Sequence, residues 1–262
     1  MKISFFINDG QPLDSAELEK WERRMTKTSA LKLYRRFGDP RAQKLFYQAD
    51  YLDLEVLRNT ITDIRMCLTD SLIDLKLSTP YTLSDAATMA SVKVARGKNV
   101  KIHSQILIEN LPKEFNLADL FDDFMDLMLT NSNENRRICL KGAPDHMIVK
   151  AIGEKEQIIV ESAGGLPVES RFYNHYGDLI SISTKRLEDY PFIMVGTTYL
   201  KNGKSAGGVC HQYKPEGTGF RVDFSDEFPA SFPPAMIYQH QMHALNEYSI
   251  WYMELLKKRY AI

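Results

Sequence analysis

The sequence has few cysteines, no long apolar run and no clear excess of charge of either sign. Its 262 residues include three cysteines, Cys67, Cys139 and Cys210, which lie far apart and form no CxxC pair. Cysteines this sparse are typical of reduced thiols, buried as small apolar side chains in a cytoplasmic protein, and they argue against a disulfide framework. No window of about eighteen apolar residues occurs, and the apolar run at 3–7 is too short for a signal peptide. We therefore expect a cytoplasmic protein with no membrane-spanning helix.

The balance of charge argues against a nucleic-acid partner. The chain has 33 Lys and Arg against 34 Asp and Glu, which gives a formal net charge of −1. Proteins that bind nucleic acid without sequence preference depend on a strong positive field. The overall charge supplies no such field, so we expect the partner to be of another class.

The short motifs of several enzyme classes are also absent. Neither GxxxxGK[ST] nor GxGxxG occurs, so no nucleotide cofactor is predicted, and no GxSxG turn presents a serine nucleophile. Cys210 and His211 are neighbours in a predicted strand, where adjacent side chains point to opposite faces, so we expect no catalytic dyad. Asp145 and Glu161 flank a predicted hairpin as nuclease carboxylates do, but Ser-Ala follows Glu161 where such a site has a lysine. The sequence predicts no cofactor and favours a protein without catalytic activity.

The second half of the chain has strand patterning with a turn signal about every ten residues, which indicates an antiparallel sheet. Asn202-Gly203 is the strongest of these signals and predicts a type I′ hairpin turn. The proline-rich segment 227–234 predicts an extended crossing loop. The predicted strands are 137–140, 146–152, 157–162, 179–184, 192–200, 207–213 and 220–224.

The first half is mainly helical, and a last helix is predicted for 234–259. Asp14 and Glu17 have the spacing of a capping box, and Thr79-Pro80 is expected to end the longest helix. The other predicted elements are strands at 3–7 and 100–108 and helices at 14–37, 54–77, 84–94 and 117–129. We predict an α+β fold with an N-terminal strand and helices, a central-to-C-terminal antiparallel sheet, and a C-terminal helix. A single domain, 1–262, is favoured, and a division into 1–130 and 136–262 is the alternative.

The helix predicted for 54–77 carries a continuous apolar stripe. Its residues recur at spacings of three and four, and they are Leu54, Leu57, Ile61, Ile64, Leu68, Leu72 and Leu75. Such a stripe packs either within the molecule or against a second chain as a coiled-coil seam. The second possibility predicts a homo-oligomer formed through 54–75, as in a structural subunit of a larger assembly.

Two surfaces are candidates for binding another protein. One is the acidic side of the helix at 117–129, made up of Asp119, Asp122, Asp123 and Asp126. The other is an aromatic run with a basic start, made up of Arg171, Phe172, Tyr173 and Tyr176. Charged patches steer association, and aromatic and arginine side chains are enriched at interface centres. With no catalytic motif present, we predict a non-catalytic protein-binding module, such as an inhibitor or immunity-type protein that neutralises a toxin or enzyme.

The last helix carries the alternative, a metal-dependent hydrolase. His240, His243 and Glu247 are spaced by three and four residues and therefore lie on one side of a helix. A zinc site needs further ligands, for which His211 is a candidate. The HExxH pattern is absent because Gln241 follows His240.

Overall fold

The structure is a computed structural model that describes residues 1–8, 10–162 and 167–261, and it has the α+β fold expected from the sequence. The helices are α1 Ser15–Phe37, α2 Pro40–Gln48, α3 Leu54–Met66, α4 Asp70–Ala95, α5 Leu117–Leu129, α6 Asn133–Gly142 and α7 Pro234–Tyr260. The strands are β1 Lys2–Ile7, β2 Gln11–Leu13, β3 Asn99–Glu109, β4 Ile148–Gly153, β5 Glu156–Glu161, β6 Ser170–Tyr176, β7 Phe192–Tyr199, β8 Ser205–Glu216 and β9 Gly219–Pro229. No helix among the described residues is both long and apolar enough to cross a membrane.

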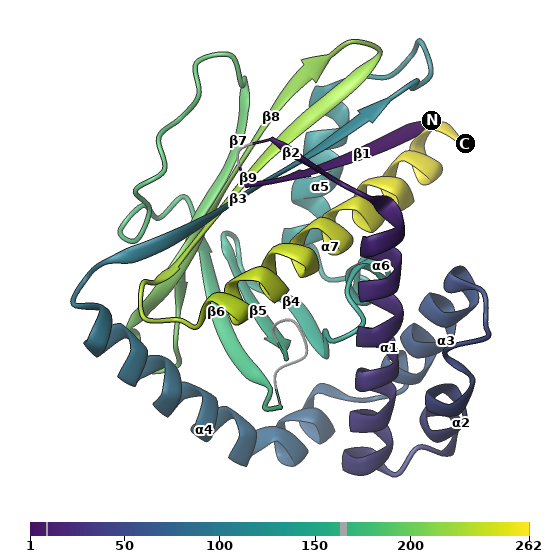
Figure 1. The fold of residues 1–262 in the computed structure, drawn as a ribbon, viewed down its shortest axis with the longest axis vertical. Helices are drawn as coiled ribbons and strands as arrows, with labels where there is room; N and C mark the ends of the chain where they lie inside the picture. Colours follow the sequence, from purple (N-terminus) through teal and green to yellow (C-terminus); the bar gives the residue numbers. More distant parts are fainter. Residues whose placement is uncertain (9, 163–166, 262) are drawn as a thin grey trace.

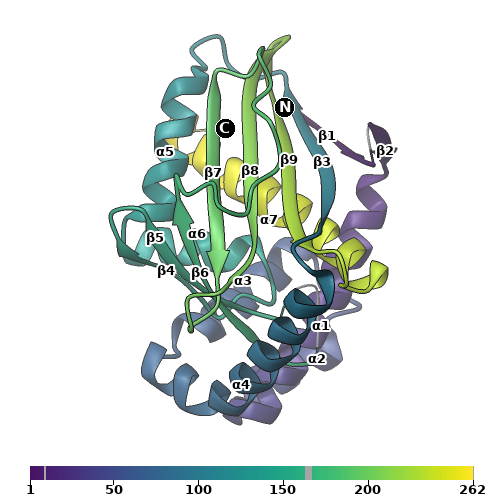
Figure 2. The ribbon, with the colours of Figure 1, turned by 90° about the vertical axis from the view of Figure 1, so that its left-hand side faces the viewer.

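The strands form one antiparallel sheet that curves around α7 (Figures 1 and 2). Their order is β2-β1-β3-β9-β8-β7-β6-β5-β4, so neighbours in the sheet are mostly neighbours in the chain. Alternate residues of each strand face α7. His211 of β8 and Phe224 of β9, for example, are paired across the sheet, and both contact the ring of Tyr248 on α7. The inner face of the sheet is therefore covered by a helix that follows all the strands in the chain.

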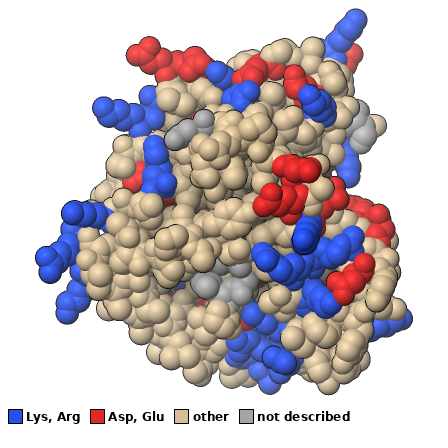
Figure 3. Space-filling view, in the orientation of Figure 1, with Lys and Arg blue, Asp and Glu red and all other residues tan. Residues whose placement is uncertain are grey.

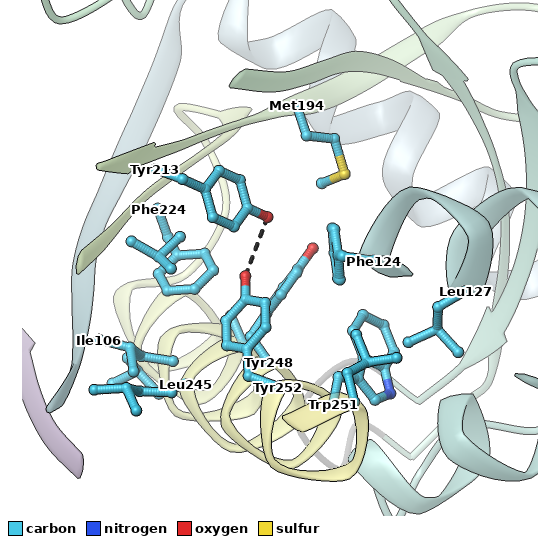
Figure 4. Close-up of a cluster of buried hydrophobic side chains, with 14 of the residues drawn as sticks. Ile106, Phe124, Leu127, Met194, Tyr213, Phe224, Leu245, Tyr248, Trp251 and Tyr252 are labelled. Atoms are coloured by element: carbon cyan, nitrogen blue, oxygen red, sulfur yellow. Dashed lines mark hydrogen bonds between the residues drawn. The ribbon is translucent and has the colours of Figure 1, made fainter. Parts of the chain in front are cut away.

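Aromatic side chains fill the space between α7, α5 and the sheet (Figure 4). Phe124 of α5 is fully buried and packs against Tyr248, Trp251 and Tyr252 of α7. The hydroxyl groups of Tyr252 and Tyr213 are 3.1 Å apart, which satisfies two polar atoms inside this core. The spacing of Tyr248, Trp251 and Tyr252 along α7 places all three on the side that faces α5 and the sheet.

A second hydrophobic cluster joins the first four helices to the start of the β4–β5 hairpin. Leu57, Ile61 and Ile64 of α3 are each at most 1% exposed in this cluster, whereas Leu75 of α4 is 72% exposed. The apolar stripe predicted for 54–75 is thus divided between two helices, and its central residues pack inside the chain rather than on its surface.

The single helix predicted for 54–77 is wrong because Thr69 starts a new helix. The Thr69 hydroxyl accepts a hydrogen bond from the Leu72 amide and caps α4. Pro80 lies inside α4 instead of ending it. The helix loses one backbone hydrogen bond at Pro80, but Leu77 and Tyr81 on either side are buried in the second cluster and keep it continuous.

Two predicted strands and one predicted turn are also wrong. Residues 137–140 belong to α6, whose N-terminus is capped by the Ser132 side chain. Residues 179–184 cross the face of the sheet that is turned away from α7, where Glu227 accepts hydrogen bonds from the Ser183 and Thr184 amides. The β7–β8 turn has a positive φ at Gly203 alone, so it is not type I′.

Outside these segments, most predicted elements are confirmed within a few residues. The predicted helix at 117–129 has the bounds of α5, and β9 extends to Pro229 and includes the first residues of the predicted crossing loop. Cys139 and Cys210 are buried free thiols as expected, but Cys67 is exposed because it lies between α3 and α4.

Candidate metal centre

Two histidines and two glutamates meet beneath α7, at the end of the β4–β5 hairpin. His243 and Glu247 are one turn apart on α7, and His146 lies just before β4. Glu161 is the last residue of β5, and the antiparallel register that places Ile148 opposite Val160 brings it next to His146. All four side chains are less than 10% exposed. Ionisable groups buried this deeply are costly unless they pair with one another or with an ion.

The imidazole Nε2 atoms of both histidines point at the two carboxylates. His146 Nε2 is 2.8 Å from Glu161 Oε2 and 3.4 Å from Glu247 Oε1. His243 Nε2 is 3.3 Å from Glu161 Oε2 and 3.5 Å from Glu247 Oε2. One ligand atom from each of His146, His243 and Glu247 lies within 4.8 Å of the other two. Two imidazoles and one carboxylate around a common point are a usual ligand set for zinc and for iron(II).

Asp145 adds a third carboxylate behind His243. Its Oδ1 atom is 3.1 Å from His243 Nδ1, on the opposite side of the ring from Glu161 and Glu247. A carboxylate at the second ring nitrogen of a histidine fixes the orientation of the ring and makes Nε2 a better ligand. Asp145 therefore has the position of an outer partner to a metal ligand.

The pKa values of the cluster follow from the competition between burial and charge. Burial alone lowers the pKa of His243, but the carboxylates of Asp145 and Glu161 outweigh it and raise that pKa well above its ordinary value. His146 is affected in the same way, with Glu247 and Glu161 raising its pKa. Burial raises the pKa of Asp145, yet His243 brings it down to about 2. The three nearby carboxylates thus favour the positively charged form of both histidines.

Arg65 holds the segment that carries Asp145 and His146. Its guanidinium is fully buried, and Nη1 donates to the carbonyl oxygens of Ala143 and His146 at 2.7 Å each. Nη2 donates to the carbonyl oxygen of Leu140, at the end of α6, also at 2.7 Å. One side chain of α3 thus fixes the backbone between α6 and β4 from which two of the cluster residues project.

A cavity of about 110 Å³ is lined by α7 and reaches the cluster. At its outer end are Phe228, Phe232 and Met236, which are partly exposed, and at its inner end is Trp251. The ionisable cluster lies between these ends. Of the described residues that line the cavity, none is a lysine or an arginine. The ionisable group is thus connected to the surface by a mostly apolar path, which is typical of ligand sites.

Comparison with models of protein families and with curated protein sequences finds no match to this chain. Its function is therefore inferred from its own residues.

The structure places the four predicted metal ligands in two groups. His243 and Glu247 belong to the cluster, but His240 and His211 flank Asp226 of β9 instead. His211 Nε2 is 2.9 Å from Asp226 Oδ1, and His240 Nε2 is 3.7 Å from Asp226 Oδ2. The ring of His240 stacks on that of His243 with centroids 5.6 Å apart, so this second group borders the cavity next to the first.

The residues predicted to bind a protein partner are largely engaged within the chain. Asp119 and Asp123 both pair with Arg259 of α7, while Asp122 and Asp126 are exposed. The face of the molecule in Figure 3 carries Lys and Arg in separate groups, some beside acidic side chains, with broad uncharged areas between them.

The four residues of the predicted aromatic surface lie on β6 and face opposite sides of the sheet. Phe172 and Tyr176 line the cavity, and the Tyr176 hydroxyl donates to Gln157. Arg171 pairs with Asp74 and lies over the ring of Tyr81. Tyr173 is half-buried. The run is therefore divided between the cavity and the opposite face.

Proposed function

We propose that the protein binds one divalent transition-metal ion through His146, His243 and Glu247 and uses it to hydrolyse a substrate held in the cavity. The observation that carries this proposal is the convergence of the three buried side chains on one point at the inner part of a mostly apolar cavity. Three protein ligands leave a coordination position for water or substrate, which is the usual arrangement of catalytic zinc.

The charge of the cluster supports an ion at this place. The carboxyl groups of Asp145, Glu161 and Glu247 surround the two imidazoles, and the raised pKa values of His146 and His243 bring two positive charges to them as protons. A divalent ion with two neutral imidazoles gives the same net charge. The ion can therefore replace two protons without changing the buried charge, as metal ligands commonly exchange protons for an ion.

Glu161 is the candidate general base. Its Oε2 atom contacts the Nε2 atoms of both histidines, so it lies beside the point that the ligands share. A bound metal lowers the pKa of its water, and a neighbouring carboxylate takes the proton as the water attacks. In ester hydrolysis the water oxygen bonds to the carbonyl carbon, the bond from that carbon to the alcohol oxygen breaks, and the alcohol leaves with a proton.

The first test is the metal content of untagged protein dialysed against zinc, iron(II) or manganese. We expect about one equivalent of one of these ions in the wild type. His146→Ala and His243→Ala should each retain less than about a tenth of it, because two ligands rarely hold such an ion in competition with buffer. His175→Ala is the matched control, since His175 lies on β6 with its side chain 39% exposed. A wild-type protein that takes up no ion, or folded variants that keep theirs, would contradict the proposal.

The second test distinguishes metal binding from catalysis of hydrolysis. Glu161→Gln keeps the size of the side chain but cannot accept a proton. We expect it to lower the rate of ester hydrolysis about 100-fold or more, since a general base typically contributes that much. Its metal content should stay near one equivalent. Equal rates in the variant and the wild type would remove Glu161 from the reaction.

The non-catalytic protein-binding module stays a prediction. Asp122 and Asp126 are its exposed acidic residues. The buried cluster does not support the protein-binding prediction. A surface that binds another protein has no need of ionisable side chains buried beneath a helix.

A further inference from the structure

We propose that the substrate is an uncharged molecule with an unbranched aliphatic chain, and that this chain lies along α7 in the cavity. The inference deepens the proposed function, because it rests on the same cluster for the reaction. The inference is based on the extent of the cavity along α7, the charges around it and the polarity of its lining.

The residues that line the cavity are spread along α7. Residues on successive turns of α7 line it, from Met236 through His240 and Ala244 to Trp251. Fifteen residues of helix span about 22 Å. Its volume of about 110 Å³ is smaller than the roughly 150 Å³ of an engineered cavity that binds benzene. A small volume spread over this length fits a straight chain better than a ring.

The charges around the cavity oppose an anionic ligand. Its lining includes Asp226 beside the cluster glutamates, and no lysine or arginine among the described residues. Asp226 Oδ1 is 2.9 Å from His211 Nε2, and Glu161 Oε2 is 2.8 Å from His146 Nε2, so both carboxylates pair with imidazoles. A phosphate or sulfate group inside the cavity would meet these carboxylates and would find no lysine or arginine among the described lining residues to pair with.

Polar side chains on the sheet side already make hydrogen bonds within the protein. Gln157 donates to the Met128 carbonyl oxygen and accepts from the Tyr176 hydroxyl. The Thr198 hydroxyl donates to the Asn174 side-chain oxygen. These groups therefore have less capacity left to recognise a polar ligand, and the remaining surface of the outer half is aromatic and aliphatic.

Trp251 allows the chain to be detected directly. The sequence contains two tryptophans, and Trp21 is not among the residues that line the cavity. In Trp21→Phe protein, Trp251 is therefore the single tryptophan at the inner end. Straight-chain alcohols with a terminal bromine would quench its fluorescence on contact. The titration should be run on zinc-loaded and chelator-treated protein in parallel.

We expect the dissociation constant to fall about fourfold with each added methylene until the chain reaches the outer end of the cavity. A cyclic bromo-alcohol with the same number of carbons should bind at least about tenfold more weakly, because it is too wide. Equal affinity for the ring, no dependence on chain length, or tighter binding of a straight-chain alkyl sulfate would each overturn the inference.

A pair of variants checks the location. Ala244 lines the cavity on α7, and Ala244→Leu should weaken binding of the chain at least about tenfold by filling it. Ala235→Leu lies on the exposed first turn of the same helix and should leave binding unchanged. Unchanged binding in folded Ala244→Leu would overturn the inference. If Ala244→Leu does not fold, the series of alcohols of increasing length, measured in Trp21→Phe protein, still tests the inference.

The failure of this inference can be distinguished from the failure of the proposed function. Length-dependent quenching in a protein that takes up no metal would support the chain and contradict the hydrolysis. A metal-loaded protein whose Trp251 responds equally to all the alcohols would contradict the chain alone.

Discussion

Arg65→Met is expected to lower the free energy of unfolding by about 3–5 kcal/mol. The guanidinium is fully buried and donates to four backbone carbonyl oxygens, those of Ile61, Leu140, Ala143 and His146. Methionine fills a similar volume but donates no hydrogen bond, so each of these oxygens loses a donor, although the Ala143 oxygen keeps its 3.4 Å hydrogen bond from the His146 amide. Chemical denaturation with urea would measure the effect as a lower midpoint at an unchanged dependence on denaturant.

Arg41→Met is the matched control for this prediction. Arg41 makes several hydrogen bonds to Asp39, but its side chain is 51% exposed. Exposed ion pairs contribute about 1 kcal/mol or less. If the two variants unfold at the same urea concentration, the carbonyl oxygens around Arg65 are satisfied without it and the assigned role is wrong.

Phe124→Ala is expected to lower the free energy of unfolding by about 3–5 kcal/mol, through lost burial and the cavity left behind. The ring is fully buried and contacts Tyr213, Tyr248, Trp251 and Tyr252, with centroids between 5.6 and 6.2 Å away. These rings come from α7 and β8, so the cavity cannot close without a shift of α7 or the sheet. Calorimetry or circular dichroism would record the effect as a lower melting temperature.

Phe232→Ala removes the same ring from a partly exposed position at the outer end of the cavity. We expect it to lower the free energy of unfolding by less than half as much, because its ring contact is with Phe228 and less of the ring is withdrawn from water. Equal losses in the two variants would mean that the core around Phe124 repacks after the change.

Local patterns predicted most of the fold. The helix at 117–129 was predicted to the residue because its apolar spacing agrees with its packing against α7 and the sheet. Residues 137–140 were predicted as a strand because Ile138 and Cys139 favour strands locally. The Ser132 side chain instead caps a helix here, and Ile138, Cys139 and Leu140 are buried within it. Pro80 is a second example in which tertiary packing outweighs local preference. Proline normally ends a helix, but the packing of Leu77 and Tyr81 keeps α4 continuous through Pro80.

The candidate site was only half predictable. His243 and Glu247 were found because a spacing of four residues places both on one side of a helix. His146 and Glu161 lie about 80 to 100 residues earlier in the chain, and no short motif connects them to α7. One signal was available: the two residues lie at the start of one predicted strand and near the end of the next, where a hairpin brings them together.

The position of α7 has a consequence for synthesis on the ribosome. All nine described strands are translated before α7, so their inner face lacks the cover of α7 while the sheet is being made. Phe220, Val222 and Phe224, which are fully buried in the finished molecule, would meanwhile be exposed to water or to chaperones. His243 and Glu247 belong to the same late helix, so the nascent chain could not assemble the proposed ligand set, and a metal bound there would have to enter after translation of α7.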